Sequence, residues 1–215
     1  MASEAASDQP QSLLGLLPSS PDVASYIAYL STLVAATTET TPEVKSYSDA
    51  VYLNYFPLGV SFLFKPQKGY KPPTGLKLDE LKSDSLILDG LDIYNIPNTT
   101  RASTKSKPVE LAFSNHPASP LVLAWKNLIA TDTLTLMVRR DTTGKEFVEA
   151  LGEPDRKGGG GGPTSGSIGI WCEWSKHGFM VEFGGDEANG PQAWETGKDA
   201  VWKVITLFPV VQKAG

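Results

Sequence analysis

Residues 167–183 constrain the fold more than any other stretch of this sequence. Side chains alternate between two faces along 168–174, a short glycine-containing segment (175–178) follows, and the alternation resumes along 179–183. Period-two alternation on both sides of a short turn is typical of a β-hairpin. An amphipathic segment (144–151) precedes the hairpin and a strand-like run (201–208) follows it. The unit therefore reads as helix, turn, hairpin, loop and strand.

The same order of features occurs once earlier in the chain. It comprises a helical segment, the two arms of a hairpin and a later strand (20–36, 51–55, 60–64 and 86–94). Pro42 and Gly59 take the places that Pro154 and Gly178 take in the second unit. A shared order of four features favours a tandem repeat over coincidence. We therefore predict an α+β fold in which two αβββ repeats form one curved antiparallel sheet, with the helices packed on one face.

This prediction sets the domain organisation. Residues 1–18 are low in complexity and are expected to form a disordered N-terminal segment, whereas 19–215 form a single α+β domain. The repeats and the linker with insertion that joins them occupy consecutive ranges (about 19–97, 98–140 and 141–210).

Within the joining region, residues 109–113 and 134–138 are interpreted as strands. Residues 121–130 fit both periodicities, and we predict a helix there. The glycine run 158–162 is interpreted as a flexible surface loop, because a strand follows it where a phosphate-binding loop requires a helix.

Composition excludes several classes of function. The net charge of −5 argues against nonspecific nucleic-acid binding, which needs clustered lysine and arginine. No apolar run approaches the roughly 18 residues that a transmembrane helix needs. Cys172 is the single cysteine, so no intramolecular disulfide forms, and its apolar neighbours suit a buried thiol in a reducing compartment. We expect a cytoplasmic protein with no nucleic-acid partner and no transmembrane segment.

No motif for catalysis or metal binding is evident. His116 and His177 both stand in turn-like contexts, and neither has a second histidine or cysteine at ligand spacing. We therefore predict no metal, no cofactor and no catalytic residue.

Tryptophans and carboxylates around the second hairpin are the candidate functional residues. Glu173 and Glu182 on opposite arms suit paired carboxylates of a hydrolase, but a solvated sheet face explains them more simply. Trp194, in the polar segment 184–199, either packs back on the protein or contacts a partner. The residues predicted to bind a partner are Trp171, Glu173, Glu182, Asp186, Glu187 and Trp194.

The order of motifs resembles three known groups. A helix, a Leu-Gly-x-Pro turn at 151–154, the aromatic strand Trp171–Trp174 and the segment 178–183 resemble β-lactamase inhibitor proteins and the small lipoproteins of the bacterial outer-membrane assembly machinery. The first hairpin, 50–64, is similar to a segment of the eukaryotic phagosome assembly factor family. No lipobox cysteine stands near the N-terminus, so the lipoprotein role does not transfer. The resemblance implies a non-enzymatic fold that binds other proteins across a concave sheet.

These observations lead to three hypotheses about function. The first is a non-enzymatic intracellular protein-binding or adaptor protein that uses a sheet face and the 184–199 loop to hold an unidentified protein partner. The second is a hydrolase-type enzyme using carboxylates of the second repeat, which requires a deep pocket with converging carboxylates. The third is a binder of a small ligand between sheet and helices, which an apolar cavity of sufficient size would mark.

Overall fold

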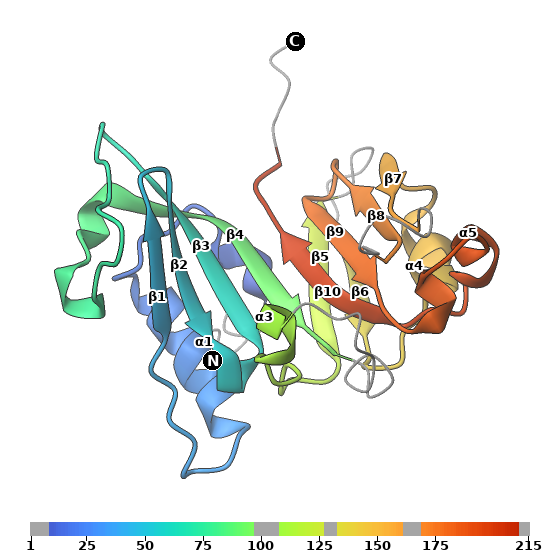
Figure 1. The fold of residues 1–215 in the computed structure, drawn as a ribbon, viewed down its shortest axis with the longest axis horizontal. Coiled ribbons are helices and arrows are strands. Elements are labelled where there is room, and N and C mark those ends of the chain that lie inside the picture. Colours follow the sequence, from blue (N-terminus) through green and yellow to red (C-terminus); the bar gives the residue numbers. More distant parts are fainter. Residues whose placement is uncertain (1–8, 97–107, 127–132, 161–168, 211–215) are drawn as a thin grey trace.

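The computed structural model describes residues 9–96, 108–126, 133–160 and 169–210. Eight strands form one sheet in the order β1-β2-β3-β4-β10-β9-β8-β7, and every neighbouring pair is antiparallel (Figure 1). Strands β5 and β6 form a separate antiparallel hairpin. The predicted α+β class with antiparallel sheet is confirmed.

Helices and short turns are interspersed among the strands along the chain. The strands are β1 (Glu43–Tyr47), β2 (Ala50–Tyr55), β3 (Val60–Pro66), β4 (Leu86–Tyr94), β5 (Leu121–Lys126), β6 (Thr133–Val138), β7 (Arg156–Gly158), β8 (Trp171–Trp174), β9 (Phe179–Phe183) and β10 (Trp202–Leu207). The α-helices are α1 (Pro21–Thr32), α3 (Pro108–Leu111), α4 (Gly144–Leu151) and α5 (Ala193–Thr196). Short 3-10 turns are η1 (Pro10–Leu13), η2 (Phe56–Leu58), η3 (Leu78–Glu80), η4 (Ser83–Ser85) and η5 (Asp186–Ala188).

Strand order is mirrored about the central pair β4 and β10. Helix α1 is followed by β1 to β4, which run from one edge of the sheet to its centre, and α4 is followed by β7 to β10, which run from the other edge to the centre. We call the first group the first half and the second group the second half. Each half contributes four strands to the sheet, one more than the three predicted, because β1 and β7 precede the two hairpins.

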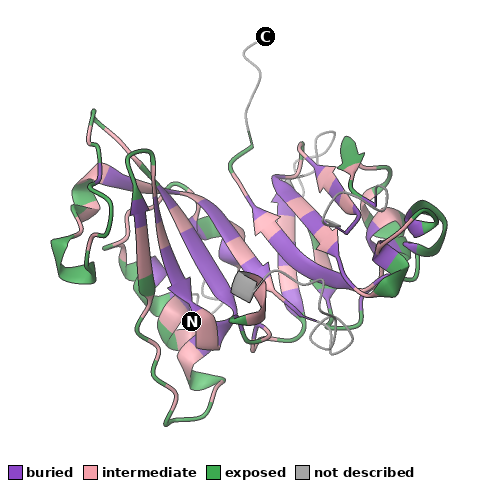
Figure 2. Ribbon diagram, viewed as in Figure 1, coloured by how far each residue is buried: buried purple, intermediate pink, exposed green. Residues whose placement is uncertain are grey.

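A row of directly paired residues crosses six strands of the sheet. It consists of Leu53, Phe62, Leu91, Leu207, Phe179 and Trp174. All six are buried, and Figure 2 shows the buried residues concentrated on the strands of both halves. Because paired residues share one face of a sheet, this row marks the core face across the whole molecule.

Both helices and the β5–β6 hairpin cover this core face. Tyr26 of α1 contacts Phe62 with ring centroids 6.4 Å apart, and Phe147 of α4 contacts Trp174 at 6.2 Å. Trp125 of β5 contacts Phe179 at 6.1 Å. These contacts place α1, the hairpin and α4 on the same side, behind the sheet in Figure 1. The opposite face, which we call the open face, is crossed by the segment that contains α3.

The helix ends follow from local sequence. Ser20 caps α1, since its hydroxyl accepts a hydrogen bond from the backbone N–H of Asp22 at 3.3 Å and Pro21 occupies the first helical position. At the start of α4 the backbone N–H of Thr143 donates to the Glu146 carboxylate at 2.7 Å, as in a capping box. Gly152 ends α4 with φ +76°, and the indole N–H of Trp174 donates to its carbonyl at 2.9 Å.

Several predicted boundaries are wrong. The disorder predicted for residues 1–18 is not found in the part that the structure describes. Leu13 is buried, and the backbone N–H of Gly15 donates a hydrogen bond to the carbonyl oxygen of Leu88 in β4 at 2.9 Å. Residues 1–8 lie outside the described residues. Residues 121–126 form strand β5 and not a helix, because Leu121, Leu123 and Trp125 alternate inward onto the core face. Residues 108–111 are helical, not extended, whereas the strand predicted at 134–138 is confirmed as β6. Within the described ranges, no helix is both long enough and apolar enough to cross a membrane.

Candidate functional site

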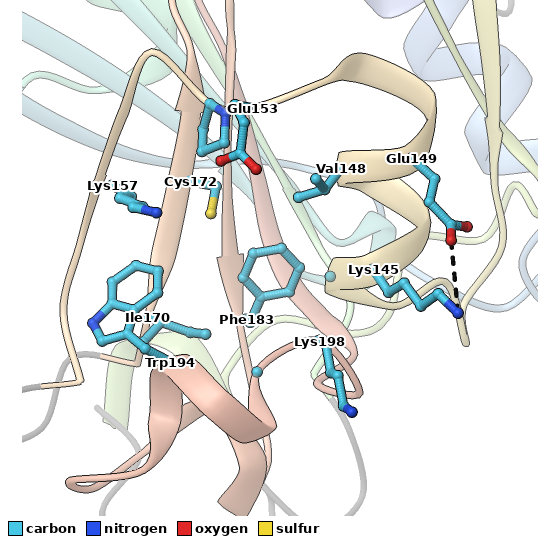
Figure 3. A pocket seen from close by; sticks show the side chains of 13 residues that line it. Lys145, Val148, Glu149, Glu153, Lys157, Ile170, Cys172, Phe183, Trp194 and Lys198 are labelled. Carbon is cyan, nitrogen blue, oxygen red and sulfur yellow. Dashed lines mark ion pairs between the residues drawn. The ribbon is translucent and has the colours of Figure 1, made fainter.

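A cavity of about 300 Å³ lies in the second half between α4, the strands β8 and β9, and the segment around α5 (Figure 3). Its apolar wall is formed by Val148, Ile170, Cys172 and Phe183. The indole ring of Trp194 lies at one end of the cavity. Ligand pockets in proteins are mostly apolar and begin at about 300 Å³, so the cavity is large enough for a small molecule.

Two glycines set how closely the walls approach. A Cβ added to Gly144 at the start of α4 would lie 2.5 Å from the carbonyl oxygen of Gly197, and one added to Gly197 would lie 2.4 Å from the carbonyl oxygen of Ala193 and against the side chain of Ile170. Both distances are too short for real atoms, so the close approach of α4, the α5 segment and Ile170 requires glycine at both positions. Above this contact Phe147 packs on Phe183 with ring centroids 6.0 Å apart, while the neighbouring Val148 faces the cavity.

Side chains alternate along β7, so Arg156 and Lys157 lie on opposite faces of the sheet. Arg156 pairs in register with Glu173, and Lys157 pairs in register with Cys172, which lies on the core face. The ammonium group of Lys157 lies 5.6 Å from the ring centroid of Trp194, a distance that suits a cation–π contact. Lys157 therefore stands at the mouth of the cavity and Arg156 on the open face.

Charged side chains surround the mouth. Figure 3 shows the Lys157 ammonium directed toward Cys172 and the Glu153 carboxylate directed over the same opening. Lys145 and Lys198 extend outward in the same view, and Lys145 pairs with Glu149 at 3.6 Å on the outer surface of α4. The two inward charges are thus one cation and one anion.

The pKa of the Cys172 thiol reflects the apolar environment of the cavity wall. Burial raises the pKa of its thiol to about 11, the positive charge of Lys157 opposes this rise, and the carboxylate of Glu153 adds to it. The thiol is therefore protonated at neutral pH and is a poor nucleophile. Cys172 therefore serves as part of the apolar wall of the cavity.

Three of the six residues predicted to bind a partner lie together on the open face. Trp171 and Glu182 are directly paired across β8 and β9, and Glu173 is two residues from Trp171. Arg156 holds this group from β7, with an ion pair to Glu173 at 3.3 Å and its guanidinium 5.9 Å from the Trp171 ring centroid. Glu173 also accepts a hydrogen bond from the hydroxyl of Ser175.

The other three predicted residues lie elsewhere. Asp186 and Glu187 are exposed on η5, where they border a shallow depression with Asn189 and Gln192. Trp194 leaves 46% of its surface exposed and faces the cavity, on the side of the sheet opposite Trp171. The six residues therefore form separate groups and not one surface.

A polar network lies in the middle of the open face. The ammonium of Lys203 donates to Glu182 at 2.6 Å and to Glu110 of α3 at 3.1 Å. Burial alone would lower the pKa of Lys203, but the two carboxylates outweigh it and raise that pKa. Phe113 stacks on Tyr94 beside this network with centroids 3.8 Å apart. Glu173 and Glu182 are each held by a different cation and are largely covered, which favours a structural role in ion pairs over a pair of catalytic carboxylates or a solvated face.

Asp92 and Thr206 join the two halves on the same face. Their side chains share a hydrogen bond of 2.7 Å between β4 and β10. Burial raises the pKa of Asp92 to about 6, the hydrogen bond from Thr206 opposes the rise, and the charge of Glu182 adds to it. Asp92 thus keeps a carboxyl group that titrates near neutral pH at the centre of the sheet.

Sequence reasoning missed Glu153 and Lys157. The segment was interpreted as a turn leading to a loose glycine run, but residues 156–158 form β7. The start of the glycine run is packed and not loose: a Cβ on Gly158 would lie 2.6 Å from the Trp171 ring, and Gly160 is buried. Residues 161 and 162 lie outside the described residues. The sequence signal for Lys157 is the short alternating run Arg156–Gly158. Pairing of this run with the aromatic strand Trp171–Trp174 places Lys157 on the core face.

Comparison of the chain with protein-family models, with curated proteins and with solved structures found no match. In the part of the chain that the structure describes, no three His, Cys, Asp or Glu side chains gather in a group suited to a metal ion. The site is therefore argued from its geometry.

Proposed function

We propose that this protein binds a small, mostly apolar molecule in the cavity between α4, β8, β9 and α5. One observation carries the proposal: an opening of about 300 Å³ whose inner wall is Val148, Ile170, Cys172 and Phe183. Concave, mostly apolar surfaces with a few polar groups at their rim are the places where proteins usually bind small molecules.

Binding of a neutral apolar probe tests this proposal. We expect 3-methylbutan-1-ol, titrated into isotopically labelled protein, to shift the backbone amide resonances of Val148, Cys172 and Phe183 more than those of the first half. Val148→Phe fills the opening and should abolish these shifts. Leu33→Phe, an apolar enlargement at the exposed end of α1, is the matched control and should bind like the parent. Shifts outside the cavity, or unchanged binding by Val148→Phe, would contradict the proposal.

A second candidate function is protein binding at the open face. The observation that favours it is the placement of α1, α4 and the β5–β6 hairpin on the other side, which leaves half-exposed residues such as Trp171, Met180 and Tyr52 facing outward. Trp171 flanked by charged groups has the make-up of an interface anchor with a polar rim. A photo-crosslinking residue at position 180 should form a discrete adduct with one protein, and the same residue at the exposed position 145 should not. Equal labelling at both positions would count against this function.

We also propose that the two halves arose as a tandem repeat, which supports a duplicated binding fold. The mirrored strand order is the supporting observation. Superposition of residues 21–94 on 143–208 through a pseudo-twofold axis at the β4/β10 pair tests it. A rotation far from a half-turn, or strands that do not overlie one another, would contradict it.

A further inference from the structure

The mouth of the cavity holds two charges of opposite sign, and the ligand must accommodate both. Glu153 stands in the turn after α4, and Lys157 stands in β7 on the register that faces Cys172. Figure 3 shows both charged groups directed over the opening. Neither is engaged in an ion pair with any residue that the structure describes. Lys157 instead rests against the Trp194 ring at 5.6 Å, which fixes its position without neutralising its charge.

Charge complementarity therefore discriminates among apolar ligands. An anion that approaches Lys157 is repelled by Glu153, and a cation that approaches Glu153 is repelled by Lys157. A ligand with a neutral polar group forms no ion pair with either residue, and water continues to solvate both charges. A head that carries an ammonium and a carboxylate together can satisfy both groups at once, and repulsion of the singly charged analogues supplies the specificity.

The cavity also limits the size of the apolar body. Each water molecule takes up about 30 Å³ in the liquid, so about 300 Å³ accommodates on the order of ten non-hydrogen atoms. The apolar wall of Val148, Ile170 and Phe183 suits a branched aliphatic or aromatic group. We infer that the ligand is a small zwitterion with one apolar side group, of the kind represented by an apolar α-amino acid, with its ammonium at Glu153 and its carboxylate at Lys157. The inference rests on the proposed function of the cavity.

Calorimetric titration with leucine and matched analogues tests this inference. We expect leucine to bind about three- to tenfold more tightly than N-acetyl-leucine, which is an anion, and than leucinamide, which is a cation, since exposed charge pairs have modest strength. Glu153→Gln should narrow the gap between leucine and N-acetyl-leucine, and Lys157→Gln should narrow the gap between leucine and leucinamide. Glu149→Gln and Lys198→Gln are matched controls, because their side chains point outward at the same rim, and they should preserve both gaps.

Each outcome separates this inference from the proposed function. Preference for leucine that both inward variants reduce and both outward variants preserve supports the zwitterion. Equal binding of leucine and 3-methylbutan-1-ol overturns the zwitterion and leaves the apolar cavity as proposed. Preference for either singly charged analogue over leucine also overturns it. Absence of binding by every compound overturns the inference and the proposed function together. The fluorescence of Trp194, with Trp194→Phe as the control for the other four tryptophans, gives an independent signal of occupancy.

Discussion

The two halves of the sheet each receive one helix on the core face, but the two helices pack differently. In the first half Tyr26 of α1 meets Phe62, and its hydroxyl hydrogen-bonds to Nε2 of the buried His116 at 3.2 Å. The space beside this contact is only about 30 Å³. In the second half Phe147 of α4 packs on Trp174 and Phe183, yet about 300 Å³ remains open beside it.

Helix length and the neighbouring segments explain the difference. Helix α1 has 12 residues and α4 has 8, so α4 covers less of its half. Around Tyr26 the segment with His116, Ala118 and Pro120 completes the wall of the small space. The comparison shows that a helix on this sheet can pack closely, so the opening beside α4 follows from the shorter helix and from the segments around it.

The largest expected effect tests whether both halves depend on the same core row. Phe62→Ala and Trp174→Ala should each lower the free energy of unfolding by about 3–5 kcal/mol, since both are large and fully buried aromatics. Denaturant titration measures the change. A variant whose midpoint matches the parent would show that its half does not contribute to the common core.

Acid sensitivity should come from His116, which precedes β5 and contacts Tyr26 of α1 in the first half. Burial lowers the pKa of His116 to about 4, while an interaction with the Ala118 carbonyl opposes that change. Below its ordinary value of 6.5 the unfolded state takes up the proton first, so the contribution of His116 to stability falls as pH drops from about 6.5 to 4. The loss is on the order of 3 kcal/mol. Nδ1–H donates to Ala118 O at 3.2 Å, which leaves Nε2 to accept from Tyr26.

The variant His116→Gln should remove the loss of stability that His116 causes between pH 6.5 and 4, because glutamine does not titrate there, whereas the opposite contribution of Asp92 remains. The free energy of unfolding measured at both ends of this range gives the slope. An equally steep slope in the variant would assign the acid sensitivity to another group.

Identical enlargements in the two helices should have opposite effects. Val23 of α1 is 2% exposed in the closely packed half, so Val23→Leu should destabilise the protein by about 1–3 kcal/mol through overpacking. Val148 of α4 faces the cavity, so Val148→Leu should stabilise it by about 0.5–1 kcal/mol. Thermal unfolding of both variants measures the contrast. Destabilisation of equal size in both helices would mean that the opening is not available to a side chain.

At the junction of the halves, Asp92→Asn should stabilise the protein at pH 8 by about 1 kcal/mol. The raised pKa of about 6 means that the contribution of Asp92 is complete below pH 4 and is lost as pH rises through 6, when burial of the charge becomes costly. The magnitude is reduced because asparagine forms a weaker hydrogen bond with Thr206 than a carboxylate does. Asparagine still accepts the Thr206 hydrogen bond, and the difference should vanish near pH 4. A variant that is less stable at pH 8 would contradict the sign.

The smallest effect is expected at the exposed end of the cavity. Trp194→Ala should change the free energy of unfolding by less than about 0.5 kcal/mol, because 46% of the side chain is exposed. Trp202→Ala is the matched control, since Trp202 is buried and donates to Arg139 O at 2.7 Å. Comparable losses in the two variants would show that Trp194 holds its loop in place. If Trp194 instead anchors a protein partner, its loss should weaken that contact by at least about 2 kcal/mol at unchanged stability.

Local patterns were sufficient to predict the elements that carry the core. The alternations in 51–64 and 170–183 predict the two hairpins that the structure contains. They were insufficient where tertiary contacts decide. Residues 121–126 fit both a helix and a strand, and the pairing with β6 together with the contact of Trp125 with Phe179 selects the strand.

The candidate site was harder to predict because it depends on distant segments. Lys157 faces the cavity through the register of a three-residue strand, and the opening depends on the approach of Gly144 to Gly197, which are far apart in the chain. Apolar alternation does reveal Ile170, Cys172 and Phe183 as inward residues. It cannot reveal that the helix above them leaves space uncovered.

The central pairing of β4 with β10 has a consequence for biosynthesis. Asp92 and Thr206, which join these strands, are 114 residues apart. At a translation rate of about 5–20 residues per second, β10 follows β4 from the ribosome after roughly 6–23 s. For that interval the nine-residue strand β4 has no partner on one side. An unpaired strand edge is a template for pairing with another chain. While β4 lacks its own β10, it can therefore pair with the β10 of another chain made on the same messenger RNA, which would produce a domain-swapped dimer.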